Sequence, residues 1–158
     1  MDCNCNGTGG TVFTSGIYCP LFEKRKFEYS YLGPSATQSI TLQRMIDCIP
    51  YGFVGLLIRI HRITALTGAQ SLVVALHNVL PSEEDTQDFV DMTGGSLVTV
   101  ASVTVQSGVT APSLLISTAT NPGPFLKCVA TVTQALSGGT TFFVEASGGL
   151  LLRTTYPR

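Results

Sequence analysis

Between Asp91 and Arg153 the chain carries only two charged side chains, Lys127 and Glu145, in a stretch rich in Val, Thr, Ser, Ala, Leu and Gly. β-Branched residues favour strands, and Gly and Ser favour the turns between them. Charged residues make up 12% of the whole chain, whereas an ordinary soluble domain carries about a quarter. This shortage of charge indicates an all-β protein whose surface is covered by partner molecules.

Runs of alternating apolar and polar residues recur along the chain, and turn residues separate them at a spacing of about ten residues, which is typical of a sandwich or barrel. One run predicts a buried strand face formed by Val54, Leu56, Ile58 and Ile60. A later run predicts another, formed by Leu126, Cys128, Ala130 and Val132. In all, the pattern predicts eight or nine strands.

Turn signals connect these runs. Asn121-Pro122-Gly123-Pro124 is the strongest in the chain. Ser137-Gly138-Gly139 predicts a hairpin turn into a strand at residues 140–146, and Gly148-Gly149 leads into the apolar run that follows. The acidic segment 81–91 interrupts the rhythm and predicts an exposed loop or a short helix.

Two regions are expected. Residues 1–22 begin with a polar segment rich in Gly, Thr, Asn and Cys, and we interpret them as a flexible N-terminal arm. Residues 23–158 form a single β-sandwich domain, which is long enough to bury a core without help. Aromatic and polar residues alternate over residues 27–31, as expected of a half-buried strand.

Charge and hydropathy weigh against several classes of partner. The net charge is −1 with nine Lys and Arg residues, so no basic face for nucleic acid or a membrane surface is visible. The most apolar run, residues 52–60, is too short to cross a bilayer. The N-terminus lacks a basic region followed by an apolar one, which predicts that there is no secretory signal. We therefore expect the protein to be made and used inside a cell, or assembled there into something that later leaves.

Five cysteines, an odd number, together with the missing signal predict that no disulfide framework forms. Cys128 and Cys48 are expected to be small core residues. Cys3, Cys5 and Cys19 have poor spacing for a zinc site, and we favour a mobile arm with exposed thiols. A metal site and an inter-subunit disulfide stay open as alternatives.

An enzyme is not expected, and neither is a cofactor. His61 and His77 fall in consecutive predicted strands, and Cys48 or Asp47 would complete a nucleophile–base pair. No orienting acid or oxyanion hole is marked, however. We therefore interpret both histidines as surface or interface residues.

Two binding sites were weighed against plain surface. The first is a calcium site in the acidic segment, formed by Glu83, Glu84, Asp85, Asp88 and Asp91. It lacks the spacing of a calcium loop, so we favour a solvated loop or a docking patch. The second is a sugar platform built on Tyr18, Tyr29, Tyr31, Tyr51 or Tyr156. Without Trp this platform is the less favoured interpretation.

A polar arm followed by a Thr- and Ser-rich sandwich of about eight strands resembles the jelly-roll structural proteins of viral particles, especially tailed-phage decoration, minor capsid and tail proteins. Residues 71–78 (SLVVALHN) and 140–146 (TTFFVEA) suit such proteins. The resemblance implies an antiparallel jelly roll and a virion location. It also implies partners that are copies of this chain, as a trimer or higher oligomer, and other capsid or tail proteins.

The sequence therefore predicts a non-enzymatic particle component whose neutral sheet faces and N-terminal arm contact neighbouring subunits. The alternative is a glycan- or receptor-binding module of a tail or fibre.

Overall fold

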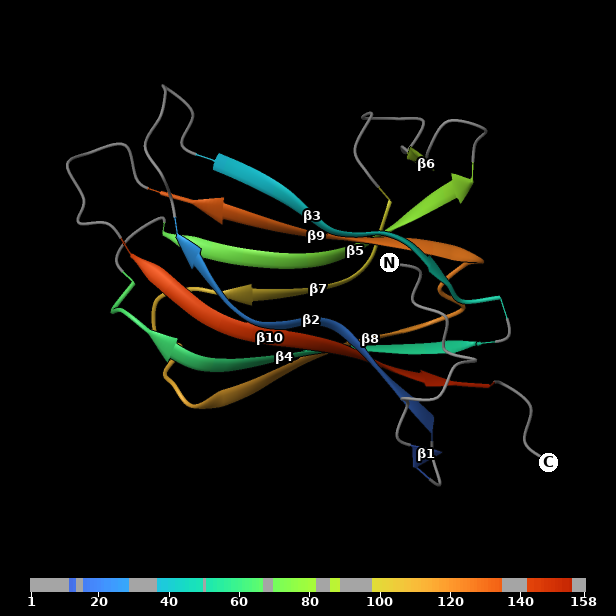
Figure 1. The fold of residues 1–158 in the computed structure, drawn as a ribbon, viewed down its shortest axis with the longest axis horizontal. Coiled ribbons are helices and arrows are strands. Elements are labelled where there is room, and N and C mark those ends of the chain that lie inside the picture. The colour runs from blue at the N-terminus through green and yellow to red at the C-terminus, as the bar shows by residue number, and fades with distance from the viewer. Residues whose placement is uncertain are drawn as a thin grey trace.

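The computed structural model describes residues 12–13, 16–28, 37–49, 51–66, 70–81, 86–88, 98–134 and 142–154. These residues form strands and connecting loops without a helix (Figure 1). The strands are β1 (Val12–Phe13), β2 (Gly16–Glu28), β3 (Thr37–Asp47), β4 (Phe53–Ile63), β5 (Ser71–Pro81), β6 (Thr86–Asp88), β7 (Thr99–Val105), β8 (Ser113–Thr120), β9 (Phe125–Thr133) and β10 (Phe143–Arg153).

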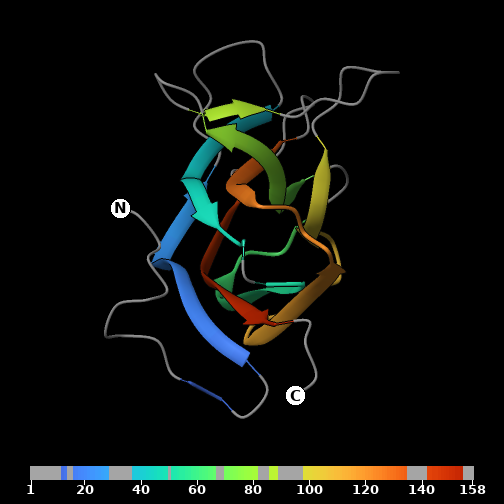
Figure 2. The ribbon, with the colours of Figure 1, turned by 90° about the vertical axis from the view of Figure 1, so that its right-hand side faces the viewer.

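The strands build two antiparallel sheets that pack face to face (Figure 2). The first sheet has the order β1-β2-β10-β4-β8, and the second has the order β3-β9-β5-β6, with β7 also paired to β5. Except for β5 and β7, consecutive long strands lie in opposite sheets. This alternation gives the two Greek keys of a jelly roll. The predicted antiparallel sandwich of about eight strands is confirmed, because β1 and β6 are the only short elements among the ten.

The core lies between the sheets and contains the predicted strand faces. The inward side chains of β4 and β9 are 0 to 1% exposed, namely Val54, Leu56, Ile58, Ile60, Leu126, Cys128, Ala130 and Val132. Their outward neighbours, apart from the buried Gly55, are half-buried or exposed, as the alternation of a strand requires. Burial of these side chains is the main driving force for folding.

Polar contacts connect the two sheets at both sides of the sandwich. The Nε2 of Gln43 in β3 donates to the backbone carbonyl of Leu21 in β2, at 2.8 Å. On the opposite side, the backbone N–H of Ser102 in β7 donates to Oγ of Ser117 in β8, at 3.3 Å. Each bond satisfies a backbone group at a sheet edge.

Two turn predictions are wrong. β9 and β10 belong to different sheets, so the connection containing Ser137-Gly138-Gly139 is a crossover and not a hairpin. Gly148 and Gly149 lie inside the continuous strand β10. A Cβ atom at Gly148 would collide with the Phe22 ring, and one at Gly149 with the Tyr18 ring. These glycines therefore make room for aromatic rings of β2 and do not precede a new strand.

β2 begins at Gly16 and pairs with β10, so this strand runs across the boundary expected at residue 22. In the acidic segment, residues 86–88 form β6, paired with β5, which corrects the short-helix alternative at these residues. Residues 1–11, 82–85 and 89–97 lie outside the described part of the chain.

Candidate functional site

The outer strand β8 differs from the other edge of its sheet in charge. Beyond its short pairing with β1, β2 exposes Pro20 and the charged residues 23–26. Charges and proline on an edge strand prevent unwanted pairing with other molecules. β8 contains no charged residue at all. The charged edge is therefore protected against association, whereas the β8 edge is not.

β8 also presents its apolar residues to solvent. Leu114 and Ile116 are 54% and 58% exposed, while the inward positions of the strand include Ser113 and Ser117. A half-buried strand ordinarily places its apolar residues inside. β8 instead carries apolar side chains on both faces: Leu115 and Ala119 pack against the core, while Leu114 and Ile116 face solvent. Adjacent large apolar side chains on the surface are typical of a contact surface.

The strand register extends this apolar surface across β4 and β10. Ile116 lies opposite Leu57, and the next two outward rows bring in Leu151 and Phe53. Gly55 and Gly149 lie among them; the Tyr18 ring covers Gly149, and Leu151 and Phe53 border Gly55. We call this surface the apolar strip; it consists of Phe53, Leu57, Leu114, Ile116 and Leu151.

Cationic side chains border the apolar strip. Arg59 lies directly opposite Leu114 and is exposed, and no ion pair to Arg59 occurs within the described residues. The Arg153 guanidinium lies over the Phe53 ring, at 5.2 Å from its centre. The nearest outward carboxylate of this sheet, Glu145, pairs with Lys24 at 3.4 Å. The surface therefore combines an apolar centre with positive charge at its border.

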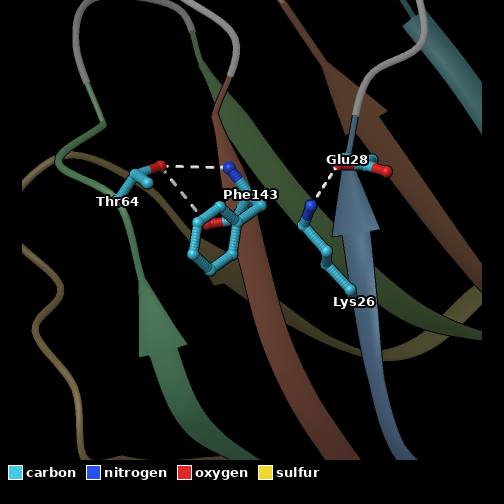
Figure 3. A network of polar contacts seen from close by, with 4 residues as sticks. All are labelled: Lys26, Glu28, Thr64 and Phe143. Carbon is cyan, nitrogen blue, oxygen red and sulfur yellow. Dashed lines mark hydrogen bonds and ion pairs between the residues drawn. The ribbon is translucent and has the colours of Figure 1, made fainter.

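Figure 3 shows the end of the sheet where β2 and β4 finish and β10 begins. The N–H of Phe143 donates to Oγ1 of Thr64 at 3.0 Å, and Lys26 pairs with Glu28 at 2.6 Å. Lys26 and Arg62 both lie over the Phe143 ring, at 5.0 and 5.8 Å from its centre. These contacts fix the start of β10 and concentrate cations at this end.

The opposite end of the sandwich contains a pocket of about 300 Å³. It lies between the β3–β4 and β8–β9 connections, which are joined by a 2.8 Å bond from Cys48 N–H to the Pro124 carbonyl. Asn121 and Gly123 have positive φ in the predicted turn. We call this cavity the end pocket; its lining is Cys48, Ile49, Tyr51, Asn121, Pro122, Gly123 and Pro124.

The end pocket is mainly apolar and has an acidic border. Ile49 on its rim is 65% exposed. The neighbouring carboxylate of Asp47 is exposed, and its Oδ1 accepts the Ile49 N–H at 2.9 Å. Burial, followed by the negative charges of Cys48 and Asp47 when these are ionised, raises the pKa of Tyr51.

The structure does not assemble a nucleophile with a base from the predicted residues. His61 and His77 fall in consecutive strands but lie in different sheets. His61 Nε2 bonds to Ser147 Oγ at 2.8 Å, and His77 Nδ1 bonds to Thr99 Oγ1 at 3.1 Å. Cys48 lies at the end of the sandwich where β4 begins, whereas His61 lies eight residues into that strand, about 26 Å from its start. The predicted residues therefore do not meet as a nucleophile and a base in this structure.

The cysteines depart from the prediction at one position. Cys48 and Cys128 are buried thiols, as expected, and burial raises the pKa of Cys128 to about 12. Cys19 is buried and disulfide-bonded, so the expectation of an exposed thiol is wrong at this position. The number of cysteines and the missing signal describe the whole chain and its compartment. They do not determine whether a particular pair of thiols lies close enough to form a disulfide. Cys3 and Cys5 lie outside the described residues.

The structure describes only some of the remaining candidate residues for a calcium or sugar site. Glu83, Glu84, Asp85 and Asp91 lie outside the described residues, and so do Tyr29, Tyr31 and Tyr156. Within the described residues, no group of three or more His, Cys, Asp or Glu side chains could hold a metal ion. Nor does that part of the chain form a helix long and apolar enough to cross a membrane.

Sequence reasoning missed the apolar strip. The strand faces that it predicted were those around Val54 and Leu126, and it assigned no faces to residues 113–117. The run Leu114-Leu115-Ile116 carries no signal of its outward side, because apolar residues occupy both faces.

No model of a protein family matches the chain, and no curated protein matches it. Among solved structures, it is similar to the VP2 subviral particle of infectious bursal disease virus, with a TM-score of 0.49 and 20% identity over 89% of this chain and 33% of that chain. A structure of the Gx strain of the same virus gives a TM-score of 0.49 and 17% identity, over 89% of this chain and 32% of that one. The chain thus spans about a third of the length of these viral chains.

Proposed function

We propose that the chain is a non-enzymatic structural subunit of a virus particle and that it associates with copies of itself through the apolar strip. The observation that carries this proposal is the pair of large aliphatic side chains, Leu114 and Ile116, more than half exposed on an uncharged strand. Jelly rolls occur in viral capsids as well as in lectins and cupins. Because one fold serves many functions, the surface is the stronger argument.

The finer expectations extend this proposal. They are a decoration, minor capsid or tail protein of a tailed phage, a trimer or higher oligomer, contacts with other capsid or tail proteins, and assembly in the host cytoplasm. A wide and nearly neutral face supports permanent association, because desolvating charges at an interface is costly. The N-terminal arm would add a second contact between neighbouring subunits.

The mass of the purified chain in solution tests the proposal. Light scattering over a hundredfold range of concentration should find a discrete trimer or larger ring. A chain that stays a monomer throughout, with the apolar strip in water, contradicts the proposal.

Deleting residues 1–11 from a Cys19→Ser chain tests the arm with the disulfide of Cys19 already removed, and it leaves both β1 and β2 in the chain. The full-length Cys19→Ser chain is the reference. Circular dichroism should stay unchanged while the concentration needed for assembly rises. Equal assembly by the truncated and full chains would exclude the arm as a contact.

One observation supports a second function, a glycan- or receptor-binding module of a tail or fibre. The ring of Tyr51 and the amide of Asn121 both line the end pocket, and sugars stack on aromatic faces while they bond to amides. A glycan array probed with the full chain tests this. Binding that Tyr51→Ala abolishes would support the module, and an array without hits would exclude it.

A further inference from the structure

The apolar strip begins near the end pocket and runs away from it. Phe53 is two residues from Tyr51 in the pocket lining, whereas Leu114 lies six residues before the end of β8, which is about 20 Å. Leu114 therefore cannot reach the end pocket of its own chain, and only a second molecule can bring Leu114 to that pocket.

We propose that Leu114 and Ile116 of one copy dock into the end pocket of a second copy, in a head-to-face contact that repeats from subunit to subunit. This inference rests on the proposed function as a self-assembling subunit and names the two surfaces that meet.

Shape and polarity of the two surfaces agree. The protruding residues are aliphatic and more than half exposed. The pocket offers Ile49, two prolines and the ring of Tyr51 in about 300 Å³. An apolar cavity of about 150 Å³ already accommodates a benzene molecule, so the pocket has room for an aliphatic side chain.

Charge supports the same pairing. Arg59 lies opposite Leu114 on the strip, and Asp47 adjoins Ile49 on the pocket rim. Both side chains are exposed. Docking the strip onto the pocket therefore brings a cation of one copy toward an anion of the other, and such complementarity selects the partner and its orientation.

The charges disfavour a twofold contact of the strip with itself. The strip is bordered by Arg59 and Arg153, so a symmetric pairing would place cations against cations. A head-to-face contact uses two different surfaces, and it closes into a ring when the rotation between subunits permits. This geometry fits a trimer or higher oligomer better than a dimer.

The experiment uses one variant for each surface of the full chain. Leu114→Asp disables the strip, and Ile49→Asp disables the pocket; both positions are exposed, so the fold should tolerate either change. Each variant alone should raise the concentration for half-assembly by at least about tenfold. Thr104→Asp, at an exposed position of β7, is the matched control and should assemble normally.

Mixing the two variants distinguishes head-to-face contact from symmetric contact. The Leu114→Asp chain keeps its pocket and the Ile49→Asp chain keeps its strip, so one intact contact can form between them. The mixture should give a heterodimer that grows no further. Light scattering measures its mass, and circular dichroism confirms that both variants are folded.

The outcomes separate this inference from the proposed function. If the wild-type chain is monomeric at every concentration, both fail. If it assembles but Ile49→Asp assembles equally well, or if the mixed variants remain monomers, the strip–pocket contact is wrong while self-assembly stands. A glycan that occupies the end pocket of the assembled protein would also overturn the contact.

Discussion

Leu114 of β8 lies directly opposite Arg59 of β4 on the outer face of the first sheet, and both side chains are exposed. The pair places a large aliphatic group beside a cation on an edge strand that has no charge of its own. An edge of this kind is a site of association unless it is covered. The β8 side of the first sheet is therefore a candidate surface for association.

Truncating a core side chain should destabilise the protein strongly. Leu126 of β9 is 0% exposed, so Leu126→Ala removes buried carbons and leaves a cavity. The free energy of unfolding should fall by about 2–5 kcal/mol, measured by urea denaturation of the dissociated chain. Thr104→Ala, at an exposed position, should change it by less than about 0.5 kcal/mol. Similar values for the two variants would show that β9 does not pack as described.

Adding a side chain at Gly149 should destabilise the protein, because the ring of Tyr18 occupies the space above this glycine. Gly149→Ala should lower the free energy of unfolding by about 1–3 kcal/mol. Adding Tyr18→Ala removes the obstacle, so the double variant should lose less than the sum of the two single changes. A purely additive result in a thermal or urea denaturation cycle would contradict this contact.

The hydrogen bond that joins the two sheets near β2 should contribute measurably to the free energy of unfolding. Gln43→Leu removes the donor to the Leu21 carbonyl and should lower the free energy of unfolding by about 0.5–1.5 kcal/mol. Gln106→Leu, at an exposed position, is the matched control and should have little effect. Equal stability of the two variants would indicate that water replaces the Gln43 amide without loss.

Cys128 should make stability depend on pH in the alkaline range. Burial raises the pKa of its thiol from 9.0 to about 12. Below pH 9.0 the native and unfolded chains both keep the proton, so the thiol adds no pH dependence. Between pH 9.0 and about 12 only the unfolded chain releases it, and rising pH favours unfolding.

Comparison with Cys128→Ala isolates this contribution from the other groups that titrate there. The difference in the free energy of unfolding between wild type and variant should be constant up to pH 9.0 and should then change against the wild type. Parallel curves for the two proteins up to pH 11 would show that Cys128 ionises in the native state.

Much of the fold could be predicted from the sequence, because the alternation of apolar and polar residues within a strand shows which side chains face the core. The alternation around Val54 and Leu126 predicted both buried faces correctly, and the turn at residues 121–124 was identified from Asn, Pro and Gly. Which strands pair with one another was harder to predict. The segment after β9 resembled a hairpin, because glycines permit a sharp turn whether the chain returns to the same sheet or crosses to the other.

The functional surfaces, too, could be predicted from the sequence only in part. By itself the sequence determined that the chain is all-β, poor in charge and suited to partners, because composition and side-chain period act over a few residues. Only the tertiary structure decided that Leu114 faces outward beside Arg59 and that Ile49 borders a pocket. It also decided that His61 and His77 lie in separate sheets. Those facts depend on which distant strands pair and in which register, and long-range packing sets the register.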